Sequence, residues 1–206
     1  MTLAPRWRTV EAVLRVAKII ERTTAEGPHT RMAIWVAGCT LRCPGCCNPE
    51  LFAADAGATM PLADIEARLD GQRGRIEGLS ILGGEPLQQP AAVAQLLRAA
   101  QGRGLGTIVF SGYTLAEART RPGFETVWSQ LDTLIDGRYE SGSTELRRRF
   151  IGSSNQRLHH RTPRYADEAL WRGPTRVEVR IDARGQVEAH GLPRAVARLR
   201  RAAETS

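Results

Sequence analysis

The chain has 206 residues, with 29 Lys and Arg against 22 Asp and Glu, which gives a formal net charge of +7. This length suits one domain, and a hydrophobic content of 42% with 25% charged residues excludes wholesale disorder. The longest apolar run, residues 32–37, is far shorter than the ~18–20 residues of a membrane-spanning helix. No basic stretch leads into an apolar signal core, so we expect a cytoplasmic protein with no membrane partner.

The positive charge is carried by arginines, because Lys18 is the only lysine. A basic excess attracts anionic partners such as nucleic acids. Here the arginines are dispersed, their densest run is 147–149, and the aromatic residues that could stack on bases make up only 5%. The composition therefore favours no direct nucleic-acid partner.

Apolar runs and helical patterns alternate along the first two thirds of the chain. After a loose lead-in over residues 1–12, residues 13–20 are compatible with a strand or a helix. In chain order we then expect a strand at 32–36, a helix at 62–69, a strand at 79–82, an amphipathic helix at 90–101, a strand at 107–110, helices at 114–118 and 124–130, and a strand at 131–135. This alternation predicts an α/β fold with mostly parallel strands.

The pattern loosens after Asp136 into a polar, arginine-rich segment in which we expect His159 and His160 to be solvated. Residues 175–189 alternate in polarity around an Ala-Arg-Gly turn, which predicts a C-terminal β-hairpin. Residues 195–203 are typical of a closing basic helix. No internal repeat and no second domain are evident, so we predict a single domain over residues 1–206.

All four cysteines of the chain, Cys39, Cys43, Cys46 and Cys47, follow the expected strand 32–36. A disulfide framework would spread cysteines to close long loops, so a metal site is the better interpretation. The first three form C-x3-C-x2-C, whereas zinc sites usually pair C-x2-C units, and four thiolates normally complete an iron–sulfur cubane. The only candidate fourth ligand is the adjacent Cys47, whose side chain points elsewhere if Cys46 is bound, so three ligands would leave one iron open.

This spacing after a strand resembles the cluster motif of radical S-adenosylmethionine (SAM) enzymes. The resemblance implies a 4Fe–4S cluster held by Cys39, Cys43 and Cys46, with SAM on the fourth iron, and reductive cleavage of SAM to a 5′-deoxyadenosyl radical. The segment Gly-Gly-Glu-Pro at residues 83–86 is similar to the family's SAM-binding segment. Its two glycines allow close backbone approach, and Glu85 can accept a charge-assisted hydrogen bond from the SAM ammonium.

The resemblance extends to other residues. The positions that it assigns to SAM binding are Gly45, Cys47, Gly83, Gly84, Glu85, Pro86, Ser111 and Asp136. Cys47 stands where relatives usually have an aromatic residue. For Asp136 the alternative to SAM binding is a purely structural role in an Asp-Gly turn. Arg138 and Asn155 could contact SAM or a partner, and for Asn155 a loop-organising or partner-contacting role is favoured over a catalytic one. No catalytic side chain is expected beyond the cluster and SAM.

Five stretches between Gly27 and Leu158 further resemble the activating proteins of anaerobic (class III) ribonucleoside-triphosphate reductase. They lie at residues 27–31, 38–46, 110–114, 131–138 and 152–157. This family implies an incomplete β/α barrel, here with a core at about 13–158 and an unassigned extension at 159–206. It also implies a glycyl-radical enzyme, the reductase large subunit, as partner, and a flavodoxin or ferredoxin-type electron donor.

Two alternatives stay open from the sequence. A radical SAM enzyme could modify another peptide or a small molecule. A non-enzymatic iron–sulfur or zinc protein is disfavoured by Gly-Gly-Glu-Pro, since a closed metal site would have no use for a SAM-binding segment.

Overall fold

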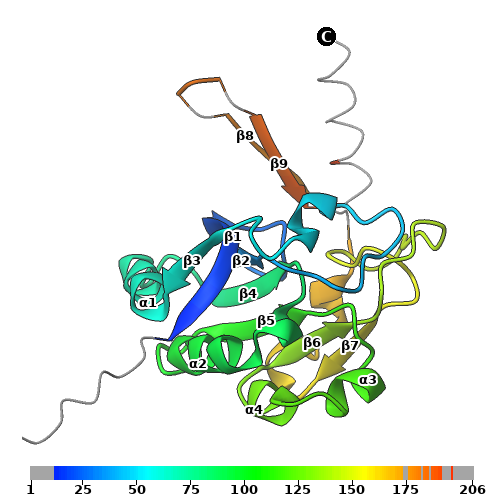
Figure 1. Ribbon diagram of the computed structural model, residues 1–206. Coiled ribbons are helices and arrows are strands. Elements are labelled where there is room, and N and C mark those ends of the chain that lie inside the picture. The colour runs from blue at the N-terminus through cyan, green and yellow to red at the C-terminus, as the bar shows by residue number, and fades with distance from the viewer. Residues whose placement is uncertain (1–11, 174–175, 182, 186, 192–195, 197–206) are drawn as a thin grey trace, which may run out of the picture.

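The computed structural model describes residues 12–173, 176–181, 183–185, 187–191 and 196 (Figure 1). The expected lead-in and the expected closing helix at 195–203 lie outside these residues, except for Ala12 and Val196. The strands of the main sheet are β1 (Val13–Thr23), β2 (Arg31–Val36), β3 (Ala58–Pro61), β4 (Gly78–Gly83), β5 (Gly106–Phe110), β6 (Thr133–Asp136) and β7 (Arg157–His160). The hairpin consists of β8 (Val177–Ile181) and β9 (Val187–Gly191).

The helices are α1 (Leu62–Gly71), α2 (Pro90–Gln101), α3 (Leu115–Arg119) and α4 (Phe124–Trp128). Within the described residues, four short 3-10 turns accompany them: η1 (Pro49–Phe52), η2 (Pro86–Gln88), η3 (Pro163–Tyr165) and η4 (Glu168–Trp171). No helix among the described residues is long and apolar enough to cross a membrane.

The seven-stranded sheet has the order β3-β1-β2-β4-β5-β6-β7. Its four central strands, β2, β4, β5 and β6, are parallel, while β1 and β7 run antiparallel to their neighbours. The predicted α/β class, the mostly parallel strands and the C-terminal hairpin are therefore confirmed. The ambiguous segment near residue 13 is a strand, since it pairs with β2 and β3 along its length.

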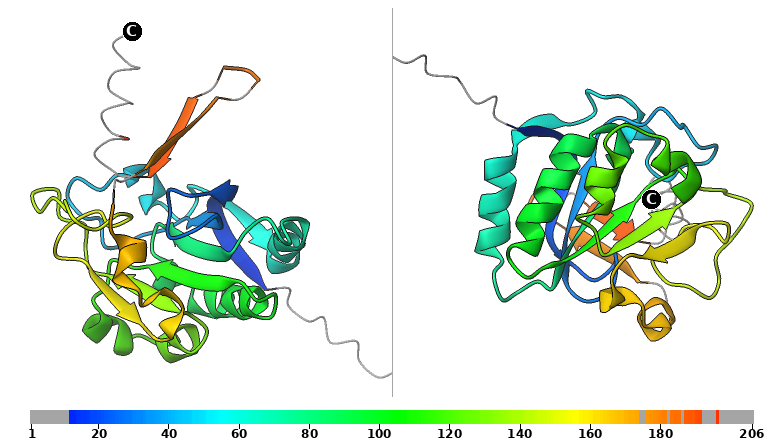
Figure 2. Two further views of the ribbon diagram at one scale, coloured as in Figure 1. Left: turned by 180° about the vertical axis from the view of Figure 1, so that it is seen from behind. Right: turned by 90° about the horizontal axis from the view of Figure 1, so that it is seen from below.

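The helices cover one face of the sheet, and the hairpin stands on the other side (Figures 1 and 2). Strand β2 is buried on both faces, as expected of a central strand with a continuous apolar sequence. Ile34 packs into the main core beneath α1 and α2, whereas Trp35 joins a smaller cluster with Leu82 on the opposite face. That second face carries the cavity described below.

Two edge strands were not expected from the sequence. Strand β3 is short and ends in a proline, a residue found at sheet edges, and β7 reads Arg-Leu-His-His. The expectation that both histidines are solvated is wrong, because adjacent residues of β7 point to opposite sides and each meets neighbours. His159 Nε2 lies 2.9 Å from Asp136 Oδ2, and His160 Nδ1 lies 2.9 Å from Thr133 Oγ1.

Arg31, at the start of β2, is fully buried. Its guanidinium donates to the carbonyl oxygen of Pro28 at 2.7 Å, the hydroxyl of Ser80 at 2.7 Å and the hydroxyl of Tyr165 at 3.1 Å. A buried guanidinium requires several acceptors to offset its lost hydration. Arg31 thereby ties the turn before β2 to strand β4 and to η3.

Candidate functional site

A cavity of about 710 Å³ opens on the sheet face opposite the helices. Its walls include the loops that follow β2, β4, β5 and β6, because the carboxyl ends of parallel strands meet at one edge of a sheet. The predicted site residues that line it are Cys39, Cys43, Cys46, Cys47, Gly83, Gly84, Glu85 and Ser111. Residues distant in sequence are therefore gathered around one space.

The cysteine loop leaves β2 and returns to η1. Gly38 N–H donates to the carbonyl oxygen of Leu51 at 3.0 Å, and Cys39 N–H donates to that of Phe52 at 3.1 Å. Inside the loop, Cys46 N–H donates to the carbonyl oxygen of Cys43 at 3.1 Å. Backbone hydrogen bonds thus fix both the base of the loop and its inner turn.

Gly45 takes the left-handed conformation that this inner turn requires, with φ at +73°. A Cβ atom there would also lie 2.9 Å from Ser141 Cβ. Gly45 does not line the cavity, and it shapes the turn between two of the predicted ligands.

The thiols differ in their acidity. The Cys46 thiol accepts a hydrogen bond from Cys47, which lowers the pKa of Cys46 to about 6 and raises that of Cys47. Burial raises the pKa of Cys39. Because the thiolate is the metal-binding form, the hydrogen bond from Cys47 favours the form of Cys46 that binds a metal.

The donor set fits an iron–sulfur cluster better than a single ion. Among the described residues no three His, Cys, Asp or Glu side chains converge as they would around one metal ion. A cubane takes one thiolate per iron, so its ligands are spread around the cluster rather than pointing at one atom. Three thiols on one loop, all facing one cavity, meet that requirement.

Cys47 lies next to Cys46 on the cavity wall. Both residues line the cavity, and their thiols share a hydrogen bond. The expectation that the Cys47 side chain points elsewhere concerns a chain whose Cys46 is bound to the cluster, and it stays a prediction.

The structure explains the two glycines at the end of β4, Gly83 and Gly84. Gly84 N–H donates to the carbonyl oxygen of Val36 at 2.7 Å, and a Cβ on Gly84 would lie 2.5 Å from the carbonyl oxygen of Gly38. Gly83 has φ at +104°. The glycines therefore let the end of β4 lie against the start of the cysteine loop, beside the cavity.

Glu85 is completely buried and accepts three hydrogen bonds. They come from Leu87 N–H at 2.9 Å, Ser111 Oγ–H at 2.9 Å and Gly112 N–H at 2.8 Å. All three donors are uncharged, and burial raises the pKa of Glu85 to about 7. The carboxyl group joins the ends of β4 and β5, and a cation bound in the cavity would favour its ionised form.

The other predicted residues lie beside the cavity rather than on its wall. Pro86 is buried at the start of η2. Asp136 is buried and accepts from Leu115 N–H, while its neighbour Gly137 lines the cavity. Arg138 forms an ion pair with Glu117 at 2.9 Å, and Asn155 donates to the carbonyl oxygen of Arg138 at 2.8 Å, as expected of a loop organiser.

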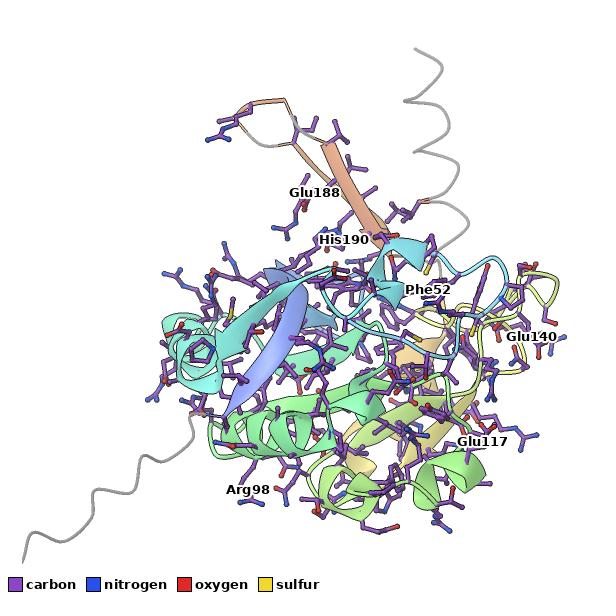
Figure 3. The ribbon with its side chains drawn as sticks, in the orientation of Figure 1. Phe52, Arg98, Glu117, Glu140, Glu188 and His190 are labelled. Atoms are coloured by element: carbon purple, nitrogen blue, oxygen red, sulfur yellow. The ribbon has the colours of Figure 1, made fainter. Side chains whose placement is uncertain are left out.

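The sequence interpretation missed a second wall of the cavity. It is formed by Lys18, Glu26, Trp35 and the hairpin residues Val179, Val187, Glu188, Ala189, His190 and Gly191. Figure 3 shows His190 at the base of the hairpin, near Phe52 of η1. The predicted hairpin pattern was the available signal, but periodicity does not reveal where a hairpin packs.

Comparison with known proteins agrees with this site. The family model described as "4Fe-4S single cluster domain" matches residues 25–159. The anaerobic ribonucleoside-triphosphate reductase-activating protein of Escherichia coli (strain K12) is 31% identical over 142 residues, which is 65% of this chain and 90% of that protein. The protein of the same name from Vibrio cholerae is 31% identical over 143 residues, 66% of this chain and 91% of its own length.

A viral relative matches the same portion. The anaerobic ribonucleoside-triphosphate reductase-activating protein of Enterobacteria phage T4 is 28% identical over 141 residues, 66% of this chain and 87% of its own length. A family match over most of the chain, together with a cavity lined by the three spaced cysteines, fixes the assignment. The chain belongs to the radical SAM 4Fe–4S family that contains the anaerobic ribonucleoside-triphosphate reductase-activating proteins, which are enzymes.

Proposed function

We propose that this protein reductively cleaves SAM and uses the product radical to remove a hydrogen atom from one glycine of an anaerobic ribonucleotide reductase. The observation that carries the proposal is the single cavity shared by the cysteine loop and the segment after β4. The proposal is also supported by the 31% sequence identity between this chain and the Escherichia coli activating protein.

The chain's own residues have separate tasks in this proposal. Cys39, Cys43 and Cys46 hold the cluster, which when bound with SAM supplies the electron that cleaves it. Glu85 accepts the SAM ammonium, since its present donors are neutral and a cation would stabilise its charge. Ser111 orients Glu85.

We extend the proposal to further residues on the cavity wall and beside it. The SAM site is completed by Gly45, Cys47, Gly83, Gly84, Pro86 and Asp136. The partner contacts a rim formed by Arg138 and Asn155. The residues form one domain whose sheet acts as an incomplete barrel around SAM. The location is cytoplasmic, and a flavodoxin or ferredoxin-type protein supplies the electron.

The decisive experiment mixes the anaerobically reconstituted protein with SAM, dithionite and the anaerobic reductase of the same organism. We expect a glycyl-radical doublet by electron paramagnetic resonance, lost when the radical glycine of the reductase is replaced by alanine. A reductase that stays radical-free while another peptide or a small molecule is converted would contradict the proposal.

The role of Glu85 is tested by SAM affinity. Glu85→Gln keeps the size of the side chain but removes its charge, so the dissociation constant for SAM should rise by about 10- to 100-fold, the worth of a hydrogen bond to a charged group. The matched control is Asp132→Asn, another buried carboxyl with backbone and hydroxyl donors that lies outside the cavity wall. If the two variants bind SAM with equal affinity, Glu85 is not part of the SAM site.

A further inference from the structure

The loop between β6 and β7, residues 137–156, has an inner and an outer side. We call it the rim loop, and Figure 3 marks its position by Glu140. Its inner side borders the cavity through Gly137, Tyr139, Phe150, Gly152 and Gln156. A partner that binds the outer side of the rim loop is therefore held next to the cavity.

Internal hydrogen bonds stabilise the shape of the rim loop. The Arg148 guanidinium donates to the carbonyl oxygens of Gln156 at 2.8 Å and Ser154 at 3.1 Å, and to Glu145 Oε2 at 2.7 Å. Glu145 also accepts from Arg147 N–H at 2.7 Å. These bonds fix the backbone on both sides of Arg148 and neutralise the charge of Glu145.

Positive charge is concentrated in this part of the chain. Residues 137–176 contain nine arginines and four acidic residues, so they carry five of the seven net positive charges. Some of these arginines are neutralised by ion pairs, such as Arg138 with Glu117 at 2.9 Å and Arg172 with Glu168 at 2.5 Å. The arginines without such a pair are the ones available to a partner.

Arg147 and Arg149 have no carboxylate partner among the described residues. Arg147 is exposed, while Arg149 is partly buried over the ring of Phe150, 4.3 Å from its centroid. Arg149 Nε is buried without a hydrogen-bond partner, and burial together with the charge of Arg176 lowers the pKa of Arg149. A cation held in these surroundings is stabilised when an anionic group joins it.

The surroundings of the two arginines favour carboxylates of a protein as that anionic group. Leu146, which precedes them, is 87% exposed, and apolar side chains beside arginines are typical of protein–protein interfaces. A guanidinium also matches the geometry of a carboxylate, to which it can donate two parallel hydrogen bonds. The rim loop thus offers an apolar contact and two unpaired guanidinium groups on one stabilised segment.

We propose that the outer side of the rim loop, through Arg147 and Arg149, docks an acidic surface of the reductase next to its glycine-bearing segment. This inference rests on the proposed function and names the surface that recognises the partner. Opposite charges on the two proteins steer their encounter and fix its orientation. Because the inner side of the same loop borders the cavity, docking brings the glycine-bearing segment to the cavity opening.

The docking surface is tested with the double variant Arg147→Glu/Arg149→Glu. The reductase concentration that gives half-maximal glycyl radical should rise about tenfold or more at low salt, since attraction becomes repulsion. For the wild-type protein this concentration should increase with added salt, and for the double variant it should increase less. Arg147→Glu alone changes only an exposed side chain, so it is the second variant and should give a smaller rise in the same direction.

The matched control is Arg75→Glu/Arg98→Glu, which changes the net charge by the same amount. Both arginines are exposed and lie outside the cavity wall, and Figure 3 shows Arg98 of α2 far from Glu140 of the rim loop. The half-maximal reductase concentration should stay within about twofold of the wild-type value. SAM cleavage without the reductase should be unchanged in every variant, which shows that the cluster site is intact.

Reductase binding measured by ultracentrifugation without SAM separates the two proposals. If the double variant binds the reductase and forms the glycyl radical like the wild-type protein, the docking surface is wrong and the activase function stands. If the wild-type protein binds the reductase without forming a radical and the double variant does not bind, the function fails and the docking surface stands. If the wild-type protein does not bind the reductase and forms no radical, both proposals fail.

A nucleic-acid role for the same arginines is tested in parallel. The probe is a single-stranded DNA oligonucleotide, and its binding is measured by fluorescence anisotropy at 150 mM salt. A double variant that loses affinity for the oligonucleotide but keeps its affinity for the reductase would overturn the proposal. A loss of reductase affinity alone supports it.

Discussion

The two walls of the cavity are built in different ways. The cysteine-loop wall is fixed by backbone hydrogen bonds, such as Gly84 N–H to Val36 and Glu85 N–H to Gly38, at the ends of buried parallel strands. The hairpin wall is attached mainly through side chains of partly exposed residues, such as Lys18 and Glu188. The chemistry shared with relatives thus lies on the more rigid part, while the wall outside the family match depends on contacts that open more easily.

The largest expected effect concerns the cysteine-loop wall. Cys39→Ala, Cys43→Ala and Cys46→Ala should each abolish a stable cluster, because a cubane with two protein thiolates is poorly held. Cys47→Ala is the matched control and should retain about four irons and four sulfides per chain after anaerobic reconstitution. Iron and sulfide analysis measures this. An equal loss in Cys47→Ala would mean four protein ligands and no open iron for SAM.

A second large effect, on the free energy of unfolding, is expected at Arg31, where the turn before β2 meets the sheet. Arg31→Ala removes a buried guanidinium and leaves its acceptors unpaired, so the free energy of unfolding should fall by about 3–5 kcal/mol. Urea denaturation of the cluster-free protein measures it. Arg73→Ala is the control, since that side chain is 81% exposed, and should change stability by no more than about 0.5 kcal/mol. A loss below about 1 kcal/mol in Arg31→Ala would contradict the anchoring role.

On the second wall of the cavity, Glu26 makes the stability of the protein depend on pH. Burial raises the pKa of Glu26 from 4.5 to about 8, despite the nearby charge of Lys18 and with added repulsion from Glu178. The folded state therefore binds more protons than the unfolded state between these values, and stability falls as pH rises through that window. Glu26→Gln should make the melting temperature fall less between pH 5 and pH 8 than it does in the wild-type protein.

A control for this pH effect is Glu21→Gln. The Glu21 side chain is 45% exposed and pairs with Arg68, so the wild-type pH profile should persist. Part of the slope will survive in Glu26→Gln, because burial also raises the pKa of Glu85 to about 7. Parallel profiles for the wild-type protein and Glu26→Gln would show that Glu26 is not buried as described.

The sequence predicts the cysteine-loop wall well, because local patterns specify it. The strand of apolar residues, the cysteine spacing and the two glycines all lie within short segments, and the amphipathic pattern located α2 at the bounds observed. The short edge strands β3 and β7 escaped prediction because Pro61 and the two histidines give no alternating apolar pattern, and long-range pairing decides their conformation.

The hairpin shows a different limit of sequence prediction. Its alternation predicted two strands around the turn near Gly185, yet alternation does not reveal that the polar face turns inward. That orientation depends on Thr24 and Trp35, which are far away in sequence and gave no signal of their own. The cavity wall formed by His190 therefore emerges only from the three-dimensional arrangement.

The smallest expected effect measures how firmly the hairpin wall is attached. Lys18 and Glu188 lie 2.9 Å apart with side chains 28% and 55% exposed, so solvent screens their attraction. A double-mutant cycle with Lys18→Met and Glu188→Gln should give a coupling of about 0.5 kcal/mol, and Lys18→Met keeps the side-chain stem near Trp35. The coupling should vanish in 1 M salt, where the Debye length is about 3 Å.

Hydrogen exchange then distinguishes local from global opening. Faster exchange confined to β9 in either variant would fit a wall that detaches without unfolding the sheet. A coupling above about 2 kcal/mol, or faster exchange throughout β2 and β4, would mean that this ion pair supports the whole fold. The contrast between a backbone-fixed wall and a side-chain-fixed wall would then be wrong.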